Sequence, residues 1–142
     1  MNSGLQSAFS PNNLTRLWQK DLANGAIDVP VVSANGSLYV VTGGVMGASW
    51  EYETNSAVYR LDSEGNVVWS ADIGTGYQLA APLIYGDAII VPSADGKVYA
   101  FYTSNGTAKW TPFDTGETLY GVTSSPVAYQ NTIISVSYTH LT

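Results

Sequence analysis

Short hydrophobic runs alternate with polar turns that contain glycine along most of the chain. Two stretches match each other best, Ala57–Trp69 (AVYRLDSEGNVVW) and Lys97–Trp110 (KVYAFYTSNGTAKW). Each reads as an aromatic and aliphatic strand, a turn with glycine, and a second strand that ends in tryptophan. Val58 and Val98 lie about 40 residues apart, and a strand-rich repeat of this length predicts the blade of a β-propeller. We therefore expect an all-β fold.

The other hydrophobic runs complete two antiparallel blades of four strands, with half a blade at each end. Runs such as 38–41 (LYVV) and 88–91 (AIIV) are hydrophobic throughout, which predicts strands covered on both faces. No window shows a helical period, so no helix is predicted. The predicted units are a flexible segment 1–13, an outer strand 14–23, blades 27–73 and 79–113, a partial blade 122–137 and a tail 138–142.

The connection 43–56 in the first blade is about ten residues longer than its counterpart in the second, and long loops often carry function. It holds Trp50 and Tyr52 beside Glu51 and Glu53, so aromatic anchors in a glycine-containing loop suggest a binding site. The two glutamates, at i and i+2 of an extended strand, would share a face and could act as paired hydrolytic carboxylates. An inert insertion is the third interpretation.

Composition narrows the classes of function. Charged residues make up 11% of the chain, the formal net charge is −6, and the five cationic residues are scattered. Nucleic-acid binding is not expected, because it needs clustered Lys and Arg. The first ten residues lack a basic start followed by a hydrophobic run, and no run is long enough to span a membrane. The low charge favours an extracytoplasmic protein whose signal was removed or lies outside this chain.

Few residues offer catalytic or metal chemistry. The chain has no Cys and a single His, His140, so a disulfide, a zinc site or a cysteine–histidine pair is not expected. Asp62, Glu64 and Asn66 look like the start of a calcium loop, but the later bidentate carboxylate is missing. We predict a hairpin turn there. Glycosylation sequons at Asn13, Asn35 and Asn105 are read as chance matches.

The repeated pattern Ala-x-Asp-x-x-x-Gly-x-x-x-Trp resembles the tryptophan-docking repeat of the PQQ-like β-propellers. The resemblance covers residues 14 to about 137, and the innermost strands carry Pro30, Pro82 and Pro126 at a family position. It departs from the family at Arg60, where Ala is usual, and at Tyr102, where Asp is usual. The resemblance implies that certain residues hold neighbouring blades together. These are Trp18, Trp69, Trp110, Ala100, Gly106 and Asp62.

The family includes quinoprotein alcohol dehydrogenases and non-catalytic BamB-type scaffolds. The dehydrogenases hold PQQ with Ca²⁺, a catalytic Asp and a vicinal disulfide, and no residue here matches that ligand set. We therefore expect a non-catalytic scaffold without cofactor, binding a protein or glycan and not inserting into a membrane. The alternatives are a segment of a PQQ-dependent oxidoreductase with its active site elsewhere, and a glycan-binding propeller. The resemblance implies about seven or eight blades in a complete member, so we expect a fragment of a larger propeller, or an open arc whose exposed blade edges could self-associate.

Overall fold

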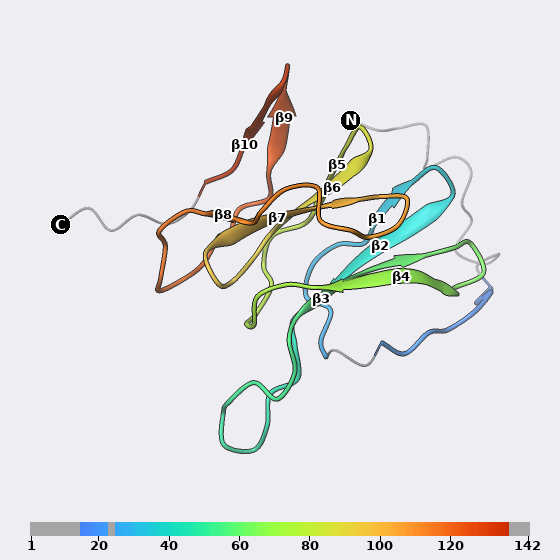
Figure 1. Cartoon of the computed structure of the whole chain (residues 1–142). Coiled ribbons are helices and arrows are strands. Elements are labelled where there is room, and N and C mark those ends of the chain that lie inside the picture. The colour runs from blue at the N-terminus through green and yellow to red at the C-terminus, as the bar shows by residue number, and fades with distance from the viewer. Residues whose placement is uncertain (1–14, 23–24, 137–142) are drawn as a thin grey trace.

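The structure, a computed structural model, describes residues 15–22 and 25–136 of the 142-residue chain. The described part contains β-strands and no helix, in two four-stranded sheets and one hairpin (Figure 1). Segments 1–13 and 138–142, with Asn13 and His140, lie outside the described residues. The strands are β1 Val32–Ala34, β2 Ser37–Thr42, β3 Ala57–Leu61, β4 Val67–Asp72, β5 Leu83–Tyr85, β6 Ala88–Pro92, β7 Lys97–Tyr102, β8 Phe113–Asp114, β9 Val127–Tyr129 and β10 Thr132–Ile134.

The strands follow one another in space in the order of the sequence. Strands β1 to β4 form the first blade, β5 to β8 form the second blade, and β9 with β10 forms the half-blade. All neighbours within these sheets are antiparallel. The predicted all-β fold of a partial propeller, with two four-stranded blades and a half-blade at the C-terminal side, is thus confirmed.

The β1–β2 hairpin shows how local sequence fixes the inner strands. Asn35 and Gly36 have φ angles of 50° and 73°, and Ala34 pairs with Ser37 across the turn. A two-residue turn needs positive φ at both central positions, which Asn-Gly tolerates best. The sequence prediction of this hairpin is confirmed.

The core lies between the blades. Strand β6 is buried along its whole length: Ile89 and Val91 belong to the cluster shared with the first blade, whereas Ala88 and Ile90 pack with Ile133 of the half-blade. Trp69 and Phe101 join the first of these clusters. Hydrophobic residues at consecutive positions are therefore explained by burial on both faces of the sheet.

Two predicted outer strands differ in the structure. Segment 14–23 was expected to be a strand, but its described residues, 15–22, pair with no other strand. The segment packs through Trp18 and Leu22 against the first blade instead. Residues 107–113 keep only a bridge from Ala108 to Phe101 before the two-residue strand β8. Pro112 precedes β8, and a residue without an N–H interrupts a hydrogen-bonded ladder.

The predicted inner strands also begin later than expected. Strand β1 starts two residues after Pro30, and strands β5 and β9 start directly after Pro82 and Pro126. Proline offers no backbone N–H for a ladder, so each inner strand pairs only beyond it.

Candidate functional site

The insertion 43–56 is a folded hairpin that projects from the first blade (Figure 1). The N–H of Glu53 donates to the carbonyl of Val45 at 2.8 Å, and the N–H of Gly47 donates to the carbonyl of Glu51 at 2.8 Å. The hydroxyl of Thr54 accepts from the N–H of Val45 at 2.8 Å. These bonds continue the antiparallel direction of β2 and β3, so the segment presents its tip on a supported stem rather than on an irregular loop.

Trp50 occupies the tip of this hairpin. Its side chain is 83% exposed, and its φ of 61° lies in the left-handed region. A bulky residue rarely adopts that conformation, and strained backbone concentrates at functional positions. The N–H of Trp50 donates to the carbonyl of Gly47 at 3.1 Å, which closes the turn and holds the backbone of Trp50 at the tip.

Tyr52 fastens the hairpin to the body of the protein. Its ring meets that of Tyr77 edge-on, with 5.9 Å between centroids, and Tyr77 belongs to the connection between the two blades. Burial raises the pKa of Tyr52, and the nearby Tyr77 and Asp28 raise it further. Tyr52 is therefore a support of the hairpin, while Tyr77, 56% exposed, adds aromatic surface beside it.

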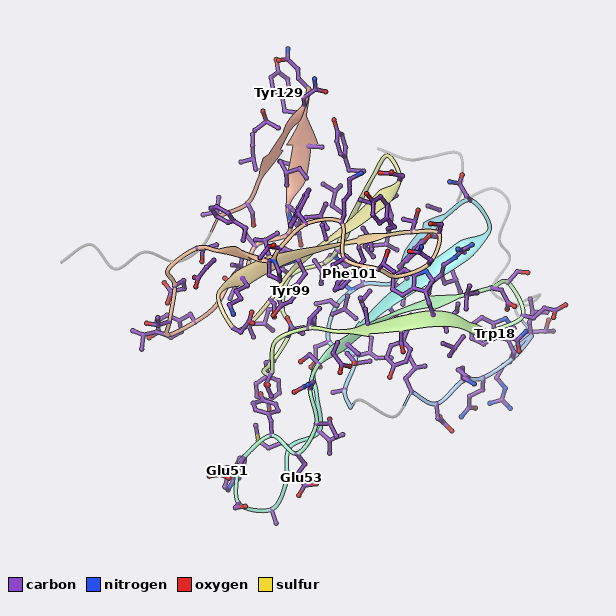
Figure 2. All side chains as sticks on the ribbon, viewed as in Figure 1. Trp18, Glu51, Glu53, Tyr99, Phe101 and Tyr129 are labelled. Atoms are coloured by element: carbon purple, nitrogen blue, oxygen red, sulfur yellow. The ribbon has the colours of Figure 1, made fainter. Side chains whose placement is uncertain are left out.

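The expected pairing of Glu51 and Glu53 on one face is wrong. Residues 51–54 bend rather than extend, so alternate side chains do not share a face. Glu53 folds over Gly47, where an added Cβ would lie 2.4 Å from its Oε1. Figure 2 shows the two glutamates on opposite sides of the loop.

The end of the molecule that carries the hairpin is acidic. In the described chain, the acidic residues in the loops and strand ends on this side are Asp28, Glu51, Glu53, Asp72, Asp95, Asp114 and Glu117, and the cation Lys97 begins β7 among them. By contrast, Arg60 and Lys109 make their polar contacts at the opposite ends of the strands, with Thr103 and with Asp87. Exposed aromatic surface at the hairpin thus lies in a negative environment, which favours a partner with positive charge.

Trp18 and Trp69 make matching contacts with the next blade. The indole Nε1 of Trp18 donates to the carbonyl of Ser63 at 2.9 Å, and its ring covers Gly65. The indole Nε1 of Trp69 donates to the carbonyl of Thr103 at 2.9 Å, and its ring covers Gly106. Each tryptophan therefore sits on the glycine of the turn one blade further along.

Trp110 differs from the other two. It is 38% exposed and lines a cavity of about 430 Å³ between the second blade and the half-blade, with Phe113 and Ile133 among its neighbours. Within residues 15–22 and 25–136, no glycine turn lies against its ring. A docking role of Trp110 therefore stays a prediction.

The remaining predicted docking residues, Ala100 and Asp62, lie in a strand of the second blade and in a turn of the first. Ala100 is buried in β7, in the cluster that includes Ile133 of the half-blade. Asp62 begins the turn before β4: its Oδ1 accepts from the N–H groups of Glu64 and Asn66, both at 2.9 Å. The side chain of Asn66 also donates to Oδ2 of Asp62, at 3.0 Å. This side-chain bond lowers the pKa of Asp62 most, and the backbone bonds lower the pKa further. The hydrogen bonds are those of a hairpin turn.

Arg60, noted only as a departure from the repeat, links the blades. Its Nε donates to the Ser37 hydroxyl at 2.9 Å, and its Nη1 donates to the Thr103 carbonyl at 2.9 Å. Thr103 thus accepts from both Arg60 and Trp69. An arginine within the hydrophobic run AVYRL was the sequence signal for this contact.

Gln78 was missed at the sequence level. It is 2% exposed, its Nε2 donates to the carbonyl of Gly74 at 3.1 Å, and its Oε1 accepts from the N–H of Ala94 at 3.1 Å. It holds the connection between the blades against a turn of the second blade. A polar residue in a loop carries no sequence signal of burial.

Within the described ranges, no group of three or more His, Cys, Asp or Glu side chains is placed to hold a metal ion. The same ranges contain no helix long and hydrophobic enough to cross a membrane.

Comparison with known proteins agrees with the architecture. The sequence profile of a family described as outer membrane protein assembly factor BamB matches residues 2–139. The outer membrane protein assembly factor BamB of Yersinia pestis is 26% identical over 111 residues, which is 76% of this chain and 27% of that protein. The crystal structure of BamB from Moraxella catarrhalis matches with a TM-score of 0.66 at 20% identity, over 84% of this chain and 36% of that one. The chain therefore spans about a quarter to a third of these relatives.

Proposed function

Since the chain belongs to the family of the outer membrane protein assembly factor BamB, we propose that it is a non-catalytic propeller scaffold that binds a protein partner outside the cytoplasm. The name of the family indicates a role in assembling other proteins. The lack of any match to a PQQ ligand set in the sequence supports binding rather than oxidoreduction.

The observation that carries this proposal is Trp50. The indole is 83% exposed on a hairpin that hydrogen bonds and the Tyr52–Tyr77 contact hold in place. An exposed tryptophan on a supported backbone is a typical anchor of a protein interface, because it buries a large area with only two side-chain torsions to restrict. The acidic surroundings favour a partner segment that combines basic residues with hydrophobic ones.

Photo-crosslinking tests this proposal directly. A photoreactive amino acid replaces Trp50 in one protein and Tyr129 in a control, both positions being exposed aromatics. Each protein is added to an envelope extract of a bacterium that carries a BamB relative. We expect a discrete protein adduct from position 50 that unlabelled wild-type chain competes away and that Trp50→Ala does not.

The same envelope-protein adduct from both positions, or no adduct from position 50, would contradict a role of the hairpin in protein binding; an adduct of position 129 with a second copy of the chain would not. An adduct with glycan rather than protein would instead support the glycan-binding alternative. Replacement of Trp50 should not disturb the fold, because Trp50 belongs to none of the core clusters.

Exposed hydrophobic side chains on β9 and β10 support a second proposal, that the chain associates with further copies of itself. These side chains include Val127, Tyr129 and Ile134. Exposed hydrophobic surface of this kind marks sites of protein association.

A further inference from the structure

The described chain contains two Asn-Gly pairs in turns, and their surroundings differ. Asn35-Gly36 joins β1 to β2, and Asn105-Gly106 follows β7 in the second blade. Gly36 and Gly106 both have a φ of 73°. A third pair includes Asn24, which lies outside the described residues. The first two pairs thus share their sequence and the conformation of their glycine, and they differ in what surrounds that glycine.

An Asn-Gly pair can react with itself. The backbone nitrogen of the glycine, after losing its proton, forms a bond with Cγ of the asparagine. The bond from Cγ to the side-chain nitrogen breaks, ammonia leaves, and a cyclic imide remains. Water opens the imide at either carbonyl, which gives aspartate or isoaspartate, in which the main chain runs through the side-chain carbon. Glycine permits the approach because it has no Cβ to obstruct it or to restrict the backbone.

The turn at Gly36 leaves its nitrogen open to this reaction. The pairing across the turn belongs to Ala34 and Ser37, and among the described residues the N–H of Gly36 has no backbone acceptor. A Cβ added at Gly36 would meet nothing within 4 Å, and Asn35 is exposed. The turn therefore has room to rotate until Cγ of Asn35 reaches the nitrogen.

Gly106 lacks this freedom. Its N–H donates to the carbonyl of Tyr102 at 2.9 Å, and the ring of Trp69 lies so close that an added Cβ would be 2.6 Å from it. The side-chain oxygen of Asn105 accepts from the N–H of Thr107 at 3.0 Å and from its hydroxyl at 2.8 Å. Rotation toward the reactive geometry would therefore break hydrogen bonds and displace the indole that joins the two blades.

We propose that Asn35 is a site of spontaneous deamidation in the folded chain, and that the docking of Trp69 protects Asn105 from the same reaction. Asn35 lies just before the start of β2, whereas the inserted segment 43–56 follows the end of that strand. Deamidation at Asn35 therefore does not depend on partner binding through Trp50.

Isoaspartate at position 35 would open the β1–β2 hairpin. It adds one carbon to the main chain of the turn, and the register of a hairpin is set by the length of its loop. Ala34 pairs with Ser37 across this turn and packs against the core cluster shared by the two blades. A longer turn therefore moves β1 relative to β2 and loosens this packing, whereas aspartate keeps the length of the turn and adds a negative charge.

Peptide mapping of the chain aged at mildly alkaline pH tests the selectivity, with fragment masses that report Asn24, Asn35 and Asn105 separately. We expect deamidation at Asn35 to be at least about tenfold faster than at Asn105, where lost hydrogen bonds and the displaced indole raise the barrier. In concentrated urea both pairs lose their surroundings and should react at similar rates. Similar rates in the folded chain, or reaction at Asn35 only after unfolding, would overturn the proposal.

Asn35→Gly tests the structural consequence, because it keeps a turn that accepts positive φ and removes the side-chain amide. We expect the thermal midpoint of the wild-type chain to fall with age as the isoaspartate peptide of position 35, separated by chromatography, accumulates. The aged variant should keep its thermal midpoint. Deamidation at Asn24 affects both proteins alike, so it does not alter the difference between them. An equal fall in both proteins would show that isoaspartate at position 35 does not open the hairpin.

Discussion

The ring of Trp69 lies directly on Gly106, one blade further along the chain. A Cβ built at residue 106 would be 2.6 Å from Cδ2 of the indole, and Gly106 has a φ of 73°. The Nε1 of the same indole donates to the carbonyl of Thr103 at 2.9 Å. Glycine is thus required at residue 106 both by the backbone conformation and by the contact with the neighbouring blade.

Gly106→Ala should separate these two requirements. We expect it to lower the free energy of unfolding by about 2–4 kcal/mol, from left-handed strain together with displacement of the Trp69 ring. Gly36→Ala is the matched control, since Gly36 has the same φ of 73° and nothing within 4 Å of an added Cβ. Its cost should be about 1 kcal/mol in urea denaturation followed by tryptophan fluorescence. Equal losses in the two variants would show that the indole contact contributes nothing.

Arg60→Met should weaken the contact between the blades. The change keeps a long hydrophobic side chain but removes the bonds to Ser37 and Thr103, and we expect a loss of about 1–2 kcal/mol. Arg16→Met is the control, because Arg16 donates to the nearby Gln19 on an exposed surface and, among the described residues, bonds to no other blade. Chemical denaturation measures both variants, and the loss from Arg60→Met should persist at high salt because its acceptors are neutral.

Tyr99 should make stability depend on alkaline pH. Burial raises the pKa of Tyr99, as does its hydrogen bond to Asp95 at 2.7 Å. The unfolded chain ionises this group near pH 10 while the folded chain keeps its proton, so its contribution is complete below about pH 10 and decreases above it. Tyr99→Phe should flatten the decline of the unfolding free energy above that pH. Tyr129→Phe, at a residue that is 65% exposed, is the matched control for the removal of a tyrosine hydroxyl.

Trp50→Gly should stabilise the protein while removing the proposed anchor. Glycine adopts the φ of 61° without strain, and the exposed indole makes no core contact, so we expect a gain of about 0.5–1 kcal/mol. The same variant should fail to compete for the adduct that the photoreactive residue at position 50 forms. Thermal denaturation provides the measurement, and a clear loss of stability would indicate that Trp50 supports the fold instead.

The pattern of hydrophobic runs and glycine turns was sufficient to predict the blades. Alternation between strand and turn is local, and Asn35-Gly36 specifies its hairpin through backbone conformation alone. The continuous hydrophobic run of β6 likewise predicted burial on both faces. The outer strands were predicted less well, because Pro112 interrupts one ladder and residues 15–22 lie on the first blade without pairing.

The sequence by itself determined the architecture, the repeat and the position of the inserted segment, since each depends on residues close together in the chain. Only the tertiary structure decided that the insertion is a supported hairpin with Trp50 at its tip, and that Glu51 and Glu53 lie apart. It also decided that Arg60 and Trp69 share the carbonyl of Thr103. These relationships depend on how residues in different blades approach one another, and side-chain packing across an interface leaves no periodic signal in the sequence.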